Sequence, residues 1–403
     1  MTSASDLLDQ LTAGIDRVQP EARKLRRLIH RHPFVGGEEA PTRQTLHSQL
    51  DWLSWRPVAG TGMYGRLGPD GPAIGLRAEL DALPVQERTG LDWASARPGV
   101  MHACGHDVHM AALWSLLQAA QGVELPVAMV PVFQPREEIS PSGANDVCSA
   151  GVLEEHDIRA MLGVHVQPRV PAGVISTGAG AVNAAFDEFH ITVHGQPGHG
   201  AYPHVSLDPI GILATIITGL GDLAGRSIDP THPTVISVGK IGGGTAPNVI
   251  AGSASCMGTV RTTNDRDREQ VHAEIRRLAE LSAAARGATA DVRVVTGGAM
   301  LYNDDALVHV IDPLIEHTGV RLARRPFRSC GSDDFSAYCE RIPSVMMFAG
   351  TGTPAAMTDR VQVGLHHERY LPDEEAIRLA AYALACGYVG AVEMGRPRVG
   401  DSD

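Results

Sequence analysis

The segment AIGLRAEL, residues 73–80, is where the fold of this chain can first be predicted. It is an apolar run of strand length, and a helix-like segment at 108–121 separates it from a second apolar run, VAMVPVF, at 127–133. Another helical segment at 144–155 and another apolar run at 161–166 continue the alternation. Strands that alternate with helices in this way predict a mostly parallel sheet covered by helices, which is the α/β class.

The pattern changes after residue 184. From there the sequence predicts strands at 186–194, 234–241, 248–261 and 290–295, with helices at 207–223 and 267–286. This βαββαβ order is that of a complete, ferredoxin-like domain. Because the α/β pattern returns after Tyr302, we predict one discontinuous domain, 1–183 and 297–403, interrupted by an inserted domain at 184–296.

Composition excludes several classes of protein. The 403 residues hold 34 Lys and Arg against 46 Asp and Glu, so the net charge is −12 and binding to nucleic acid is not expected. Hydrophobic residues make up 43% and charged residues 20%, which is typical of a globular protein. The first residues lack a secretory signal pattern, and the apolar stretch at 209–220 is too short to cross a bilayer. We therefore expect a cytoplasmic protein with reduced cysteines and no membrane partner.

The segment 6–30 predicts a surface helix that is interrupted at Pro20.

Ionisable side chains follow three of the predicted strands. Asp81 comes directly after the first strand, Glu137 and Glu138 follow the second, and His165 lies on the third. Ligands of open α/β sheets bind at the carboxyl ends of the strands, so we expect these side chains to share one cleft.

The 18 histidines cluster in a few short segments, and one of these is MHACGHDVHM at residues 101–110. Cys104 and His106 are two residues apart, which places them on one face if the segment is extended. Thiolate and imidazole together suit zinc, manganese-tolerant, cobalt or nickel sites better than magnesium or calcium sites. A second such segment is Leu365-His366-His367. The sequence thus predicts a transition-metal site.

The chain resembles a known family, the amidohydrolase branch of the dinuclear-metal aminoacylase and carboxypeptidase superfamily. This branch includes hippurate hydrolases, N-acyl-amino-acid amidohydrolases and indoleacetyl-amino-acid hydrolases. The resemblance covers nearly the whole chain. Its motifs are LRAELDALPV (76–85), MHACGHDVHM (101–110), FQPREE (133–138), GVHV (163–166), GQPGHGAYPH (195–204), Asn248-Val249-Ile250, GSDDFS (331–336) and Leu365-His366.

The resemblance implies a discontinuous catalytic domain and an inserted lid domain that also forms a homodimer. It implies two divalent metal ions held by Cys104, His106, Glu138, His165 and His366. Glu137 would be the general base, which takes a proton from the attacking water and passes it to the leaving amine. His102, His109 and His367 remain as neighbours that orient these groups.

Four more residues receive roles. Asp81 is expected to orient a ligand imidazole, because ligating histidines usually donate their second N–H to a carboxylate or carbonyl. In relatives the histidine that corresponds to His199 helps to stabilise the oxyanion, often from the partner subunit. Asn248 and Arg261 match lid positions that bind the substrate carboxylate, a role suited to a guanidinium group.

The chain departs from the family pattern at Glu79, Arg136, Gln167 and Ala251, and none of these departures removes a ligand. Arg136 either favours an anionic substrate at the cleft rim or points to solvent.

The expected function is metal-dependent hydrolysis of the amide bond of a small N-acyl amino acid or similar conjugate. A dipeptidase or carboxypeptidase of the same superfamily is the alternative. From other classes we consider a non-catalytic metal- or peptide-binding protein, a hydrolase with Cys104 as nucleophile and His106 as base, and a dinucleotide site at GTGMYG, residues 60–65. The last is disfavoured because a turn, and not a helix, follows it.

Overall fold

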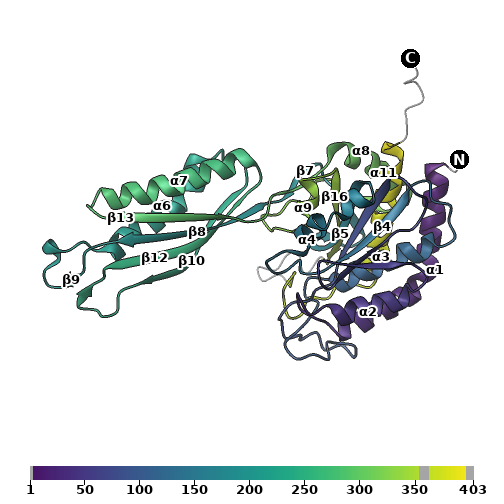
Figure 1. The fold of residues 1–403 in the computed structure, drawn as a ribbon, viewed down its shortest axis with the longest axis horizontal. Coiled ribbons are helices and arrows are strands. Elements are labelled where there is room, and N and C mark those ends of the chain that lie inside the picture. The colour runs from purple at the N-terminus through teal and green to yellow at the C-terminus, as the bar shows by residue number, and fades with distance from the viewer. Residues whose placement is uncertain (1–2, 354–362, 396–403) are drawn as a thin grey trace, which may run out of the picture. The chain divides into compact units, whose positions relative to one another are not determined.

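The computed structural model describes residues 3–353 and 363–395. The chain divides into two compact units (Figure 1), of which unit 1 comprises Met1–Gly180, Tyr302–Phe327 and Asp334–Asp403, and unit 2 comprises Ala181–Leu301 and Arg328–Asp333. The predicted insertion at 184–296 lies within unit 2. Unit 2 also includes 328–333, because Ser329 bridges to Asn183 and the carbonyl of Cys330 accepts a hydrogen bond from Arg261.

Unit 1 is built on an eight-stranded sheet with the order β1-β2-β4-β3-β5-β16-β6-β15. Its middle strands run parallel: β4 (Ala128–Gln134), β3 (Ala73–Glu79), β5 (Ile158–Pro171) and β16 (Ser344–Gly352). Every residue of β3 and β4 is buried, as expected of strands covered on both faces. The outer strands are β1 (Trp55–Val58), β2 (Gly62–Gly65), β6 (Val174–Ser176) and β15 (Arg321–Leu322). The predicted α/β class is confirmed.

Three long helices of unit 1 pack on one another and share the main core: α1 (Ala4–Arg31), α3 (His106–Ala120) and α11 (Glu375–Met394). The predicted interruption of α1 at Pro20 is wrong. The buried face of α1 continues on both sides of that proline, and this packing outweighs the one missing backbone hydrogen bond. The remaining helices are α2 (Ala40–Gln49), α4 (Gly143–Ser149), α5 (Val152–Glu155), α8 (Asp305–His317) and α9 (Ser336–Cys339). The predicted helix 144–155 is therefore divided, at Gly151, whose φ is 77°.

By length and composition α11 is apolar enough to cross a membrane, and it is the one such helix among the described residues. However, 83% of its most apolar window is buried inside the protein. Its apolar side chains are thus used in the core, where they pack on α1, α3 and α8.

Unit 2 has the predicted βαββαβ order. Its antiparallel sheet has the order β10-β12-β8-β13, and α6 and α7 cover one face of it (Figure 1). The elements are β8 (Ala185–His194), α6 (Pro209–Ser227), β10 (Thr234–Gly243), β12 (Ser253–Thr262), α7 (Asp265–Ala284) and β13 (Thr289–Thr296). Shorter elements are β9 (Gly198–His199), η1 (Pro203–Val205) and β11 (Val249–Ile250), while β7 (Gly180–Asn183) and β14 (Leu301–Asn303) lie where the chain passes between the units.

A buried ionic cluster fastens α1 to the start of α3. Asp107 accepts hydrogen bonds from Arg26 Nε at 2.9 Å and from His30 Nδ1 at 3.0 Å, and the second ring nitrogen of His30 lies 3.2 Å from Glu87. Burial by itself would lower the pKa of His30, but Asp107 and Glu87 outweigh it and raise the pKa to about 9. His30 is therefore an imidazolium held between two carboxylates at neutral pH.

This cluster predicts a pH-dependent stability. Because the pKa of His30 is raised in the folded protein, its contribution is complete below about pH 6.5 and is lost as the pH rises through about 9. We expect His30→Gln to lower the free energy of unfolding by roughly 2–3 kcal/mol at pH 6 and by much less at pH 10. Urea unfolding of both proteins with chelator present measures the difference, and a difference that does not shrink between the two pH values contradicts the assignment.

Candidate metal centre

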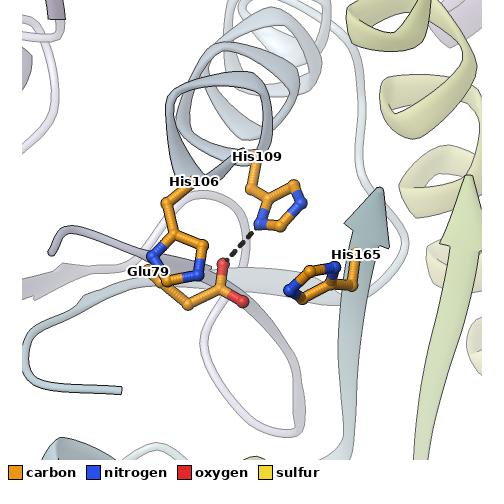
Figure 2. Close-up of side chains that lie close together, drawn as sticks. All are labelled: Glu79, His106, His109 and His165. Carbon is orange, nitrogen blue, oxygen red and sulfur yellow. Dashed lines mark hydrogen bonds and ion pairs between the residues drawn. The ribbon is translucent and has the colours of Figure 1, made fainter. Parts of the chain in front are cut away.

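The predicted site residues of unit 1 meet at the carboxyl ends of three adjacent strands. Asp81 follows β3, Glu137 and Glu138 follow β4, and His165 lies on β5. Because these strands are parallel neighbours, their carboxyl ends lie at one edge of the sheet. His106 is the first residue of α3, whose start faces the same edge. Figure 2 shows His106 and His165 turned toward each other, with Glu79 and His109 beside them.

Gly105 allows Cys104 and His106 to lie next to each other at the start of α3. Its φ of 87° is left-handed, and a Cβ atom at this position would lie 2.4 Å from Val166 Cγ2. Any other residue would therefore strain the backbone and push α3 away from β5. The close approach of these two elements brings Cys104 Sγ within 3.5 Å of His165 Nε2.

Among the described residues four groups of donor atoms lie close enough to hold a metal ion, and two of these groups share Glu138. Cys104, Glu138 and His366 form one group and His106, Glu137 and Glu138 the other, and within each group the ligand atoms are no more than 4.8 Å apart. His366 Nε2 lies 3.1 Å from Glu138 Oε1. His106 Nε2 lies 3.8 Å from Glu137 Oε2 and 4.0 Å from Glu138 Oε1. Glu138 belongs to both groups and is thus placed between two neighbouring positions.

His366 reaches this site through a strained backbone. Its φ is 66°, a left-handed value that a non-glycine residue seldom adopts, and its N–H is held by the carbonyl of Ala103 at 2.8 Å. Strain of this kind persists where the surrounding structure imposes it, and it is frequent at functional sites.

Main-chain carbonyls orient the two buried imidazoles that are candidate ligands. His106 Nδ1 donates to the carbonyl of Asp81 at 2.8 Å, and His165 Nδ1 donates to the carbonyl of Val166 at 2.7 Å. In both rings Nδ1 is thus engaged by a carbonyl, and Nε2 is the nitrogen that remains for a metal.

Asp81 contacts His106 as expected, through its main chain. Its main-chain carbonyl, and not its carboxylate, makes the close hydrogen bond to His106. The carboxylate instead accepts the N–H of Glu138 at 2.9 Å, while its other oxygen lies 3.5 Å from His106 Nδ1. Asp81 thereby fixes the backbone of one candidate ligand and the ring of another.

The electrostatics of the site fit a divalent cation. Burial lowers the pKa of His106, but Glu79, Asp81 and Glu138 outweigh it and raise the pKa to about 10. Burial, Glu138 and Glu137 together raise the pKa of the Cys104 thiol well above its usual value. Among the described residues, His106 Nε2 is buried without a hydrogen-bond partner. An excess of carboxylates, a buried thiol and an unpartnered imidazole nitrogen form a donor set suited to a transition metal.

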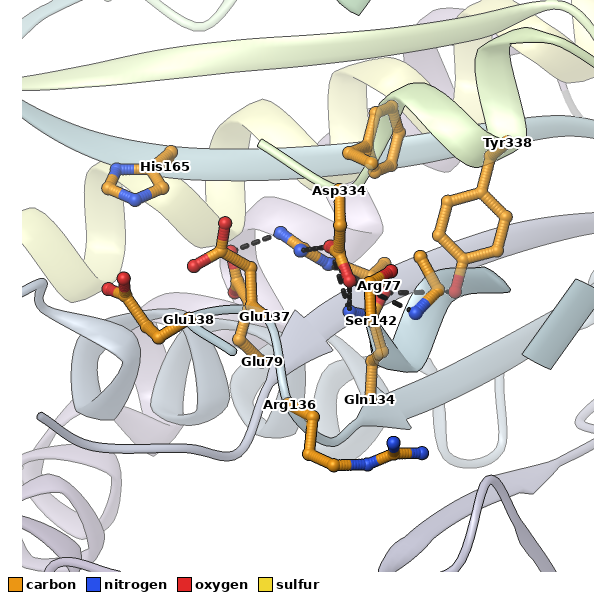
Figure 3. A network of polar contacts seen from close by, with 12 residues as sticks. Arg77, Glu79, Gln134, Arg136, Glu137, Glu138, Ser142, His165, Asp334 and Tyr338 are labelled. Atoms are coloured by element: carbon orange, nitrogen blue, oxygen red, sulfur yellow. Dashed lines mark hydrogen bonds and ion pairs between the residues drawn. The ribbon is translucent and has the colours of Figure 1, made fainter. Parts of the chain in front are cut away.

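A second layer of buried polar residues lies beneath these groups (Figure 3). Arg77 pairs with Glu79 and, at 2.7 Å, with Asp334, whose other oxygen accepts from Gln134 at 2.8 Å and from the N–H of Ala144 at 3.0 Å. The sequence interpretation assigned no role to Arg77 or Asp334. A signal was present, because a fully buried strand seldom contains both an arginine and a glutamate unless they are paired.

Arg136 has neither of its two expected roles. Figure 3 shows its side chain directed away from Glu137 and Glu138. Its guanidinium donates to the carbonyl of Pro141 at 2.8 Å and to Asp146 at 2.5 Å. With a φ of 54°, Arg136 turns the chain sharply after β4 and so fixes the loop that carries the two glutamates.

The remaining predicted residues belong to unit 2. Gly200 N–H donates to the carbonyl of Asn248 at 2.8 Å, so His199 and Asn248 lie together, where β9 pairs with β11. The N–H of Ala201 donates to His199 Nδ1 at 3.1 Å, which leaves Nε2–H of His199 as an exposed donor. Arg261 is on β12 and donates to the carbonyl of Cys330 at 3.0 Å.

Within unit 2, Arg261 and His199 lie toward opposite ends of the sheet. Arg261 pairs with Phe186, near the start of β8, whereas His199 follows the other end of that strand, at His194. Eight residues of extended chain span about 26 Å. One substrate of amino-acid size therefore cannot touch both residues of the same unit.

Two of the competing interpretations, the dinucleotide site and the cysteine nucleophile, find no support in the geometry. GTGMYG runs through the turn between β1 and β2, and its last four residues are the buried strand β2, so no helix start is available for a pyrophosphate. The raised pKa of the Cys104 thiol is the opposite of what an activated nucleophile requires.

Gly105 provides a test of the site geometry. We expect Gly105→Ala to weaken binding of a divalent transition metal at least tenfold, because a side chain at this φ must displace α3 from Val166. Competition with a metal chelator measures the affinity. Gly122→Ala is the matched control, since Gly122 has a φ of 80° but no atom within 4 Å of an added Cβ. Equal affinities for the two variants would show that the close approach to Val166 is not needed.

The chain is similar to characterised proteins over most of its length. It is 34% identical to an N-acetylcysteine deacetylase of Bacillus subtilis, covering 90% of this chain and 94% of the relative. It is also 34% identical to an N-acetyldiaminopimelate deacetylase of Exiguobacterium sibiricum, covering 88% and 95%. A crystal structure of a dinuclear metal binding peptidase of Bacillus subtilis superposes with a TM-score of 0.82 at 31% identity, covering 94% of this chain and 99% of that one. Residues 75–386 match the model of peptidase family M20/M25/M40, and the chain belongs to that family, as its motifs indicate.

Proposed function

We propose that this protein is a metal-dependent amidohydrolase that cleaves N-acyl amino acids into a carboxylic acid and a free amino acid. The observation that carries the proposal is the convergence of Cys104, His106, Glu138, His165 and His366, with Glu137 beside His106 and Glu138. Two deacetylases of N-acetylated amino acids among the relatives support an acyl amino acid as the substrate.

We propose that these five residues hold two divalent transition-metal ions, with zinc, manganese, cobalt and nickel as the candidates. Glu138 would contribute to both positions, since its carboxylate belongs to both donor groups. When bound, such a pair polarises an amide carbonyl and lowers the pKa of water. The relative described as a dinuclear metal binding peptidase supports this stoichiometry.

Glu137 is the proposed general base. Its carboxylate lies beside His106 and Glu138, so it faces the space between the candidate ligands. There it would take the proton from the attacking water and transfer it to the nitrogen of the leaving amine. Asp81 would hold His106 and Glu138 in place through the two hydrogen bonds described above.

Metal analysis and a substrate screen test this function. The purified protein should contain a transition metal and hydrolyse N-acetyl or N-benzoyl amino acids in a reaction that chelator abolishes and added metal restores. Glu137→Gln should retain the metal and lose at least a hundredfold in kcat, whereas Cys104→Ala should lose metal. A metal-free wild-type protein without chelator-sensitive hydrolysis would exclude the function. Faster cleavage of dipeptides than of acyl amino acids would favour the peptidase alternative.

We further propose that unit 2 forms a homodimer and that His199 serves the metal centre of the second copy. The proposed role of His199 is to donate a hydrogen bond to the oxyanion. Two observations support it: within unit 2 His199 lies toward the opposite end of the sheet from Arg261, and its Nε2–H is exposed. The edge strand β10 and the exposed apolar side chains Tyr202, Val205, Ile241 and Val249 support a partner surface on this unit. Asn248 and Arg261 are then proposed to bind the substrate carboxylate from different subunits.

Complementation between two inactive variants tests this arrangement. His199→Ala and Glu137→Gln proteins, each nearly inactive, should regain about a quarter of wild-type activity after being unfolded and refolded together. Half of the dimers are then mixed, and each mixed dimer holds one site with both residues intact. Absence of recovery, in dimers shown to be mixed by mass spectrometry, would mean that His199 acts within its own chain.

A further inference from the structure

His109 lies among the candidate ligands, yet its two nitrogens are already engaged. It is fully buried, and its ring centroid lies 4.6 Å from that of His165. One of its ring nitrogens lies within 4.8 Å of a possible metal-binding atom of each of Glu79, His106 and His165. By distance alone, these four residues could hold another ion. However, His109 Nδ1 lies 2.9 Å from Glu79 Oε2, and the N–H of Val166 donates to His109 Nε2 over 2.9 Å.

These two contacts determine the state of the ring. A backbone N–H can only donate, so Nε2 of His109 is the acceptor and carries no proton. The single ring proton is therefore on Nδ1 and is donated to Glu79 (Figure 2). Arg77 binds the other oxygen of Glu79, so this carboxylate is held as the acceptor. No lone pair of His109 remains for a metal.

Val166 connects His109 to the ligand His165. The ladder between β3 and β5 ends at the pair Arg77 and Gly163, so the N–H of Val166 lies beyond the last paired residue of that edge. A buried N–H needs an acceptor, and His109 replaces the missing strand. The carbonyl of the same residue accepts the Nδ1 proton of His165 at 2.7 Å. Val166 thus donates its N–H to the imidazole of His109 and accepts, at its carbonyl, the proton of the imidazole of His165.

We propose that His109 is a positioning residue and not a metal ligand. Through Glu79 on one side and Val166 on the other, it fixes the backbone that keeps the proton of His165 on Nδ1 and so presents Nε2 to the metal. The inference rests on the proposed function only in taking His165 as a ligand.

Substitutions can separate the two hydrogen bonds of His109. In His109→Gln the amide oxygen can reach the place of Nε2 and accept the Val166 N–H. In His109→Asn the shorter amide can replace Nδ1 as donor to Glu79 but does not reach Val166. His109→Leu removes both bonds. The pair of amide variants keeps the test usable if the leucine variant does not fold.

The first measurement needs no metal. Histidine-selective ¹⁵N labelling of the metal-free protein reports which ring nitrogen of His165 is protonated. We expect an Nδ1–H signal in the wild type and in His109→Gln, and a shift toward the Nε2–H form in His109→Asn and His109→Leu. An unchanged His165 signal in the last two variants would overturn the proposal, whatever the activity of the protein.

The second measurement is the affinity for Co²⁺ by chelator competition, with the visible spectrum of the bound ion. We expect His109→Asn and His109→Leu to lose 10- to 100-fold in Co²⁺ affinity and to show an altered spectrum. In His109→Gln both the affinity and the spectrum should stay near those of the wild type. The number of ions bound per chain should be unchanged in all three variants. Loss of one ion per chain at saturating metal would instead make His109 a ligand and refute the proposal.

His272→Gln is the control, because it replaces another histidine that bonds a carboxylate, Asp187, but that belongs to unit 2 and not to the metal centre. It should leave both the His165 signal and the Co²⁺ affinity unchanged. If the wild type binds no metal, the proposed function fails, but the tautomer of His165 still decides the role of His109.

Discussion

The concentration of carboxylates at one edge of a buried sheet is the constraint on which the rest of unit 1 depends. Glu79, Asp81, Glu137 and Glu138 lie around the ends of β3 and β4, where burial penalises every uncompensated charge. Arg77 compensates the deepest of them from within the sheet. The outer carboxylates face imidazoles and a thiol, a set that a divalent ion neutralises more completely than protons do. A metal-binding function is thus built into the charge balance of the fold.

The candidate site residues were predictable because each is recognised from its neighbours in sequence, and the parallel sheet then brings them together in space. Asp81, the two glutamates and His165 each follow or end an apolar run, and parallel neighbouring strands bring such positions to the same edge. The support of these ligands was not predictable. It depends on backbone atoms, such as the carbonyls of Asp81 and Val166, and on left-handed turns at Arg136 and His366. Residue types alone do not report these.

The order of the elements followed from hydrophobic periodicity, and the departures have local causes. α1 passes through Pro20 because a long buried face holds it against α3 and α11, a tertiary effect that propensity does not include. The helix predicted for 144–155 ends early where Gly151 adopts a left-handed conformation. The short segment 328–333 joins unit 2 through contacts with Asn183 and Arg261, which lie far from it in sequence. Long-range pairing of this kind has no periodic signal.

The histidines of the MHACGHDVHM segment show why hydrogen bonding, and not proximity, separates ligands from their supports. His106 is anchored at Nδ1 by a carbonyl and keeps Nε2 unpartnered, as a ligand requires. His109 lies as close to the site but has both nitrogens engaged. Neither nitrogen of His102 has a hydrogen-bond partner among the described residues, and burial lowers its pKa to about 3, so it is a neutral ring with nothing to orient it. A ring that is fixed on one side and free on the other can bind a metal at little further entropic loss, and His106 meets this condition within the segment.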